Sequence, residues 1–172
     1  MGEVRYALVS NTIPAPRPGM SSNDILRKQL KHVIAALETW AKEMAPWAKI
    51  ELGPLNGAWR ISAVPHAPTA CPFEIVIRPD RKFDINVGGE IYEDQPFDAL
   101  TDIPQMVRSI ANGRVLIRRW RGQATGILYS TETLIDLPGT DEGHFRRPNP
   151  DAPSIEGVEV EAEVEAFAPY RR

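Results

Sequence analysis

The amino-acid sequence predicts an α+β fold of two layers, and three observations carry this prediction. Apolar residues recur with a helical period in the stretch 22–45, and they recur at every second position in three later stretches. A second helical stripe then precedes one further pair of strands. We therefore expect the order α-β-β-β-α-β-β, with a mainly antiparallel five-stranded sheet and both helices packed on one of its faces.

The length and composition are those of one ordinary globular domain. The chain has 172 residues, 42% of them hydrophobic, and its 20 basic and 23 acidic side chains give a net charge of −3. This composition excludes a wholly disordered chain. The 16 prolines are about twice the usual frequency of roughly 5%. We expect a proline-rich, irregular N-terminal arm over 1–20, an α+β core over 21–139, and a proline-containing loop with an irregular acidic tail over 140–172.

The first helix is predicted over about 22–45. Ser21, Ser22 and Asn23 offer side-chain oxygens for its N-terminal cap. Pro46 ends the helix, because a residue that precedes proline avoids the helical conformation. The stripe that would face the core consists of Leu26, Leu30, Val33, Ile34, Leu37, Trp40, Ala41 and Met44.

Three strands follow, each with one apolar face. Apolar side chains alternate with polar ones over 59–63, 73–77 and 83–87. Between the last two, the polar residues 79–82 suit the turn of a hairpin. We expect Gly88 and Gly89 to bend or bulge the third strand before it continues to Tyr92.

A second helix and a second hairpin come next. Thr101 and Asp102 are candidate caps, Pro104 suits a first turn, and Gly113 suits the position just past a helix end. Two strands are then predicted over 115–120 and about 126–137. Their connection is short enough to make them a hairpin.

The acidic tail contains a strictly alternating stretch. Over 158–165, valine or alanine alternates with glutamate. Alternation is typical of a strand, but glutamates that share one side of a strand repel one another. The pattern therefore predicts either an edge strand added to the sheet or a disordered acidic tail.

The densest cluster of candidate binding residues lies in the first strand of the second hairpin. Arg114, Arg118, Arg119, Trp120 and Arg121 fall within eight positions. Guanidinium groups bind phosphate and carboxylate, and an indole ring stacks on bases. In an extended strand, however, Arg119 and Arg121 share one face while Arg118 and Trp120 share the other. Unless a bulge intervenes, this division favours charged strand ends whose arginines pair with Glu132 or Asp136 on the next strand.

The common catalytic and metal-binding motifs are missing from the sequence. A single cysteine, Cys71, excludes an intrachain disulfide and a multi-cysteine zinc site. There is no glycine-rich phosphate loop and no nucleophile elbow. The three histidines are scattered, and the acidic residues near 84–94 lack the spacing of a calcium loop. We therefore predict no cofactor, no metal site and no identifiable catalytic residue.

Two weaker chemical hypotheses remain. Cys71 with His66 would be a nucleophile and its base, against the alternative that the thiol only packs beneath a loop. Glu132 and Asp136, four positions apart on a strand, are about 13 Å apart by the strand rise, which is wider than a typical pair of catalytic carboxylates.

The function class favoured by these observations is a small binding or adaptor module that engages a protein partner or its own copy. Unpaired strand potential at both chain ends and alternating charge blocks support it. The alternatives are an anion or nucleic-acid binder centred on the arginines and an enzyme for a small molecule. The sequence pI of about 5.7 argues against nucleic acid. No signal peptide or membrane span is recognisable, which predicts a cytoplasmic protein that binds no membrane.

Overall fold

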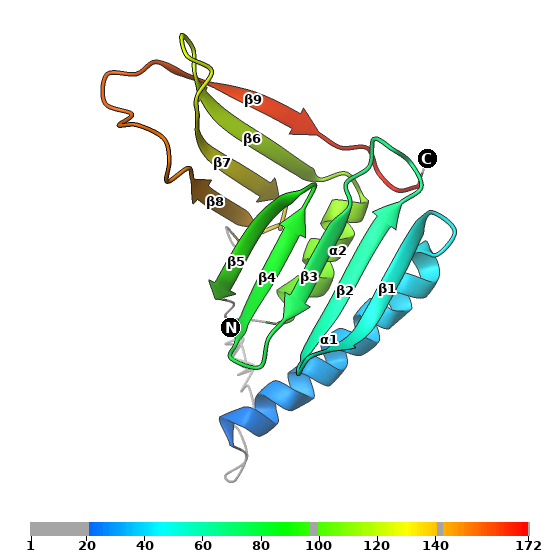
Figure 1. Ribbon diagram of the computed structural model, residues 1–172. Coiled ribbons are helices and arrows are strands. Elements are labelled where there is room, and N and C mark those ends of the chain that lie inside the picture. The colour runs from blue at the N-terminus through cyan, green and yellow to red at the C-terminus, as the bar shows by residue number, and fades with distance from the viewer. Residues whose placement is uncertain (1–20, 97–99, 141–142, 172) are drawn as a thin grey trace, which may run out of the picture.

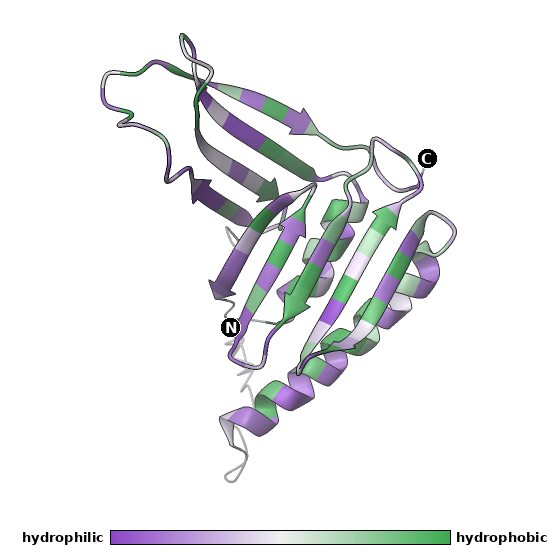
Figure 2. Cartoon of the chain, viewed as in Figure 1, coloured by the Kyte–Doolittle hydropathy of each residue, from purple (hydrophilic) through white to green (hydrophobic). Residues whose placement is uncertain are grey.

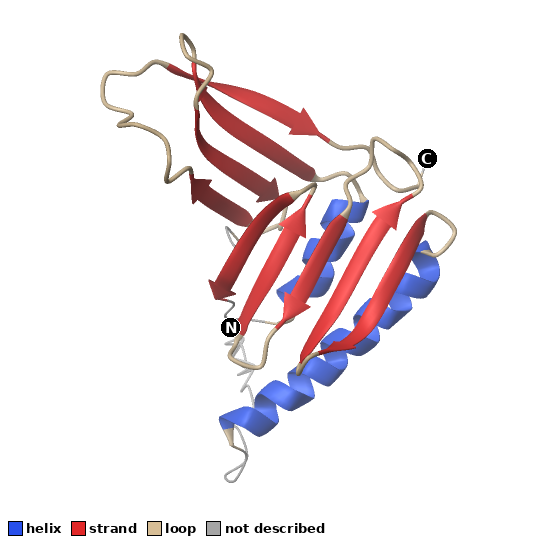
Figure 3. Cartoon of the chain, in the orientation of Figure 1, coloured by secondary structure: helices blue, strands red, loops and turns tan. Residues whose placement is uncertain are grey.

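The computed structural model describes residues 21–96, 100–140 and 143–171. Within these ranges the chain forms two helices and two antiparallel sheets (Figure 1, Figure 3). In chain order the elements are α1 (Ser22–Met44), β1 (Ala48–Leu55), β2 (Ala58–Pro65), β3 (Phe73–Ile77), β4 (Lys82–Val87), β5 (Glu90–Pro96), α2 (Asp102–Ala111), β6 (Val115–Gly122), β7 (Leu128–Ile135), β8 (His144–Pro148) and β9 (Val160–Ala166). The predicted N-terminal arm lies outside the described residues.

The α+β class is confirmed, but the single five-stranded sheet in the order α-β-β-β-α-β-β is wrong. A five-stranded sheet is present with the order β1-β2-β3-β4-β5, and a second sheet has the order β8-β7-β6-β9. The predicted second hairpin, β6 and β7, thus forms the centre of its own sheet instead of extending the first. Two strands from beyond residue 139 complete that sheet: β8 pairs with the preceding strand β7, whereas β9 pairs with β6, from which it is distant in sequence.

Helix α1 matches its prediction closely. The side chain of Ser21 accepts a hydrogen bond from the Asp24 amide at 3.3 Å and so caps the first turn. The predicted stripe faces the first sheet, with Val33, Leu37, Trp40 and Met44 buried. Burying a side chain such as Leu37 completely contributes about 1.5–3 kcal/mol, so this face fixes the helix on the sheet.

The first sheet is a succession of hairpins with one buried face. Ile61, Ile75 and Ile85 lie opposite one another on β2, β3 and β4, and all three are buried. Both helices lie behind this sheet in Figure 1, and the strand colours in Figure 2 alternate as its two environments require. The three predicted strands are β2, β3 and β4.

Two strands of this sheet, β1 and β5, were not predicted. Strand β1 contains Gly53 and Pro54, which weaken its pattern. The expected bend or bulge at Gly88 and Gly89 is wrong, because these residues form the turn between β4 and β5. Both have positive φ angles, 59° and 92°, a conformation that glycine adopts without steric cost.

Helix α2 is confirmed over nearly its predicted range. Its stripe of Ile103, Met106, Val107 and Ile110 is buried, and the helix covers the same face of the first sheet as α1 (Figure 1). Neither described helix has the length and apolar character that crossing a membrane requires.

The two sheets meet at β5 and at the inner face of the second sheet. The Tyr92 hydroxyl of β5 is 2.8 Å from the Thr133 hydroxyl of β7, and both groups are buried. Phe145 of β8 packs edge-on to Phe83 and tilted against Tyr92. Apolar packing and a buried hydrogen bond therefore join the sheets.

Candidate functional site

The arginines predicted as a binding cluster lie on both faces of β6. Arg119 and Arg121 share the inner face, toward β5. Arg118 and Trp120 share the outer face. Arg114 precedes the strand and lines a separate hollow. The structure therefore does not gather the four guanidinium groups on one platform.

Arg119 is held between glutamates from two other strands. Its Nε and Nη2 donate to Glu90 Oε1 at 3.1 and 2.9 Å, and its Nη1 donates to Glu165 Oε2 at 2.8 Å. These hydrogen bonds, first that of Glu165, raise the pKa of the guanidinium. Arg121 donates to Glu163 at 3.2 Å. Pairing with Glu132 or Asp136 was the prediction, and the partners come instead from β5 and β9.

Glu90 also binds an arginine from β8. Arg147 Nη2 donates to Glu90 Oε2 at 2.9 Å, and its Nη1 donates to the Ile91 carbonyl at 2.8 Å. Only 13% of the Glu90 side chain is exposed. One carboxylate of the first sheet thus holds two arginines of the second, which is a structural role.

The outer face of the second sheet mixes apolar and charged side chains. Leu116 of β6 lies opposite Leu134 of β7, Trp120 lies opposite Ala162 of β9, and Val164 of β9 is 55% exposed. Arg118 lies opposite Glu132 on one side and Val164 on the other. Both described helices pack on the first sheet (Figure 3), so neither covers this face.

Strand β9 lies at the edge of the second sheet. It runs antiparallel to β6 with an unbroken register from Leu116 opposite Ala166 to Gly122 opposite Val160. The acidic tail is therefore an edge strand in this structure, as one of the two predicted alternatives has it. β6 is its only strand neighbour in the described chain.

The backbone groups of β9 divide between β6 and the open edge. The Gln123 amide donates to the Glu159 carbonyl at 2.9 Å just beyond the strand. Hydrogen-bonded and non-hydrogen-bonded pairs alternate along an antiparallel ladder. The glutamates at 161, 163 and 165 consequently bond to β6, whereas the amides and carbonyls of Val160, Ala162, Val164 and Ala166 point outward.

The other strand edges carry features that hinder strand addition. Strand β1 contains Gly53 and Pro54, and β8 ends at Pro148 after only five residues. On β5, the Ile91 carbonyl already accepts a hydrogen bond from Arg147, so it is not free to bond to an added strand. Asp94 of the same strand has a φ of 55°, which distorts the extended backbone. Proline, short length and local distortion all discourage pairing. β9 contains neither proline nor glycine, and its register shows no bulge.

Cys71 lies in an environment that suppresses nucleophilic chemistry. The residue is fully buried. Burial first, and then the charge of Glu165, raise the pKa of the thiol to about 12. His66 is exposed and makes no hydrogen bond to this thiol in the described chain. The geometry thus favours packing and does not supply the base that a nucleophile needs.

The candidate metal ligands are engaged in other contacts. Arg78 pairs with Asp80, Asp84 and Asp94, and the Asn86 side chain accepts from the Gly89 amide at 3.1 Å. Across the described ranges, no group of three histidine, cysteine or acidic residues is arranged to hold a metal ion.

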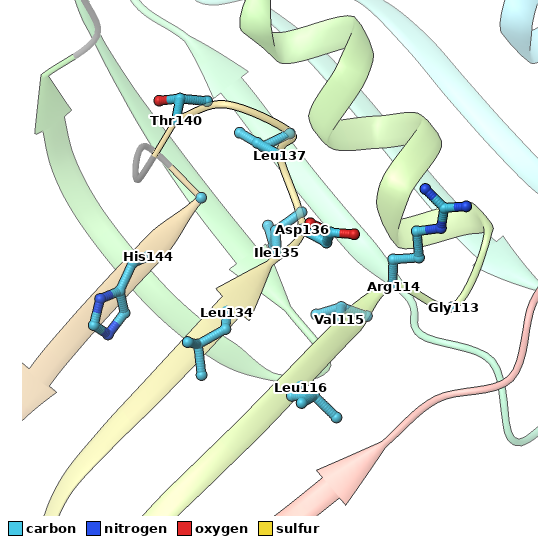
Figure 4. A pocket seen from close by; sticks show the side chains of 11 residues that line it. Gly113, Arg114, Val115, Leu116, Leu134, Ile135, Asp136, Leu137, Thr140 and His144 are labelled. Carbon is cyan, nitrogen blue, oxygen red and sulfur yellow. The ribbon is translucent and has the colours of Figure 1, made fainter.

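A hollow of about 570 Å³ lies where β6 begins and β7 ends (Figure 4). Apolar side chains of Val115, Leu116, Leu134, Ile135 and Leu137 line it, together with Arg114, Asp136, Thr140 and His144. Figure 4 shows Arg114 and Asp136 on one side of the hollow and His144 on the other. The polar groups thus do not converge as those of a catalytic site do.

In comparisons with known proteins, no family model, curated protein or solved structure matches the chain.

Proposed function

We propose that the chain is a cytoplasmic protein-binding module that captures an extended segment of a protein partner by adding it as a strand to β9. The single observation that carries this proposal is the open edge of β9, with the backbone groups of Val160, Ala162, Val164 and Ala166 directed away from β6. In strand addition, backbone hydrogen bonds supply affinity and alternate side chains supply specificity.

The neighbouring outer face supports the same proposal. On this face Leu116 and Trp120 lie opposite Ala166 and Ala162 of β9, so an apolar strip, interrupted by Arg118 opposite Val164, reaches the β9 edge. A partner strand beside β9 would extend this strip and shield Val164, more than half of which is exposed. The predicted binding residues Arg118 and Trp120 lie on β6, so β9 would separate them from the partner strand.

The alternative functions have less support. Of the four arginines predicted to bind an anion or nucleic acid, Arg119 and Arg121 are paired with glutamates. Only Arg114 and Arg118 would therefore remain to bind such a ligand. An enzyme would need a reactive group, and the buried Cys71 thiol is held in its protonated form.

The proposal is tested by selecting a random peptide library, displayed on phage, against the full chain. Selected peptides are then measured against Val164→Pro and Val164→Thr. Proline removes the outward amide without breaking the ladder to β6, whereas threonine keeps both that amide and a β-branched side chain. We expect Val164→Pro to weaken binding at least tenfold and Val164→Thr to leave it within about twofold.

Unfolding curves of both variants establish that each is folded before binding is compared. Peptides that bind Val164→Pro as tightly as the original chain would show that the β9 edge is not the binding site, and so would failure to select any peptide.

A further inference from the structure

We propose that the strand added to β9 alternates basic and apolar residues, and that the chain therefore prefers such a partner to a second copy of itself. This inference rests on the proposed function and names the chemistry of its partner. It follows from which side chains of β9 lie on each face of the sheet and from the direction of its free backbone groups.

The inner face of β9 is a row of carboxylates. Glu163 and Glu165 pair with Arg121 and Arg119, yet 62% and 44% of their side chains stay exposed. Glu161 is exposed and has no ion pair in the described chain. Three carboxylates at alternate positions therefore remain accessible from the open edge.

The outer face of β9 is apolar. Ala162, Val164 and Ala166 all belong to it, and all three are exposed. These residues also carry the outward backbone groups, so the residues that would bond to a partner strand are the apolar ones. Along β9, residues with glutamate side chains bond to β6, and residues with apolar side chains direct their backbone groups to the open edge.

The partner's pattern follows from the geometry of cross-strand pairs. Side chains directly opposite each other on neighbouring strands share a face of the sheet, with Cβ atoms about 4.5–5.5 Å apart. A positively charged partner residue opposite Glu161 or Glu163 stabilises the strand pair, and so does an apolar partner residue opposite Val164. A partner segment of about seven residues would therefore place lysine or arginine at every second position.

Self-pairing through the same edge is opposed by these charges. Two β9 strands joined through their outward groups set valine and alanine opposite valine and alanine, and glutamate opposite glutamate. Like charges directly opposite each other destabilise a strand pair. The glutamates thus discriminate between partners, because the same row that repels a copy attracts a basic strand.

The test uses three labelled synthetic peptides of seven residues with the full chain, and fluorescence anisotropy reports binding. The first has lysine at odd positions and valine or threonine at even positions. The second has the same composition with its lysines grouped at one end, and the third has glutamate in place of lysine. We expect the first to bind at least tenfold more tightly than either other peptide and to lose affinity as salt is raised.

Charge reversal on β9 gives an independent measurement. Glu161→Lys should weaken binding of the first peptide about fivefold or more and strengthen binding of the third. Glu156→Lys is the matched control, since Glu156 is exposed in the loop before the strand and carries the same charge change. It should change binding less than twofold.

Amide hydrogen exchange locates the bound peptide. Addition beside β9 should slow exchange at Ala162 and Val164, while the amides of Glu161 and Glu163, already bonded to β6, should change little. Protection that ignores this alternation would overturn the inference. Equal binding of the grouped and alternating peptides, or a dimer formed through β9, would do so as well.

The outcomes separate this inference from the proposed function. If peptides selected from the random library need the Val164 amide but lack alternating basic residues, strand addition stands and the partner chemistry is wrong. If no peptide depends on that amide, the proposed function itself fails.

Discussion

Burial decides the chemistry of Cys71 and Tyr170. The Tyr170 hydroxyl donates to the Cys71 carbonyl at 2.6 Å, and both residues are almost completely buried. Desolvation disfavours the charged form of each group and raises the pKa of both the thiol and the phenol. The contact also fixes the end of the chain against the loop that precedes β3.

The raised pKa of Cys71 predicts a loss of stability at alkaline pH. Because the folded chain holds the thiol proton more tightly, this contribution is complete below the unfolded pKa of 9.0 and is lost as pH rises toward about 12. Between pH 8 and pH 11 the free energy of unfolding should therefore fall by about 2 kcal/mol less in Cys71→Ala than in the original chain. Urea unfolding at both pH values measures this, and equal losses would contradict it.

The Tyr170 hydrogen bond predicts the effect of removing one oxygen. Tyr170→Phe keeps the ring in place but leaves the buried Cys71 carbonyl without its donor, so unfolding should require about 1–3 kcal/mol less. Urea unfolding at neutral pH measures the change. Tyr129→Phe is the control, since the Tyr129 hydroxyl makes no hydrogen bond to any described residue, and a similar cost there would refute the explanation.

At the scale of elements, the C-terminal segment is held against the end of α2. Gly113 has a φ of 74°, and an added Cβ would lie 2.8 Å from the Phe167 carbonyl oxygen and 2.9 Å from the Pro169 nitrogen. The Tyr170 amide donates to the Ala111 carbonyl at 2.8 Å. This position therefore requires glycine for its conformation and also for the close approach of another segment.

Two glycine substitutions separate these requirements. Gly139 has a similar φ of 82° with no atom within 4 Å of an added Cβ. Gly139→Ala should cost about 1 kcal/mol for backbone strain alone, whereas Gly113→Ala should cost about 2–4 kcal/mol because the clash is added. Urea unfolding compares the two, and equal costs would show that the C-terminal segment moves aside freely.

The elements that the sequence predicted well are those with a strong local signal. Helix α1 has eight apolar residues on one stripe and a serine cap, and β2 to β4 alternate cleanly. Strand β5 was missed because Gly88 and Gly89 also suit a bulge, and β8 was missed because Phe145 is its only buried residue. Where several local conformations fit one sequence, the pairing of strands decides among them.

At the scale of the whole molecule, Glu90 is the polar connection between the sheets. Its carboxylate binds Arg119 of β6 and Arg147 of β8, and the side chains of Glu90 and Arg119 are only 13% and 19% exposed. Phe145 packs against Phe83 and Tyr92 and adds apolar contacts between the two sheets. Removing the negative charge would leave two arginines without their shared partner.

Glu90→Gln should therefore lower the free energy of unfolding by about 2–4 kcal/mol. Hydrogen exchange should also accelerate in β6 to β9 more than in β2 to β4, because the second sheet loses its polar anchor. Glu51→Gln is the matched control: its ion pairs with Lys49 and Arg60 lie at the surface, where solvent screens them, so it should lower the free energy of unfolding far less than Glu90→Gln. Uniform acceleration in both sheets would contradict the role assigned to Glu90.

The candidate site was only partly readable from the sequence. The alternation of valine or alanine with glutamate over 158–165 is visible there, as is the division of the β6 arginines between two faces. The sequence does not show which strand lies beside β9, because Arg119 and Glu165, which pair across β6 and β9, are 46 positions apart. In the sequence Glu90 is one of the acidic residues near 84–94, and nothing in its position indicates that it binds two arginines of a second sheet.

The sequence by itself determined the class of the fold, the two helices and the strands whose side chains alternate, because helical and extended backbones impose their periods on neighbouring residues. Only the tertiary structure decided that the strands form two sheets, that β9 pairs with β6 and that its other edge has no strand partner among the described residues. Those features depend on pairing between distant segments, where backbone hydrogen bonds and a few buried contacts select one arrangement from several that share the same local pattern.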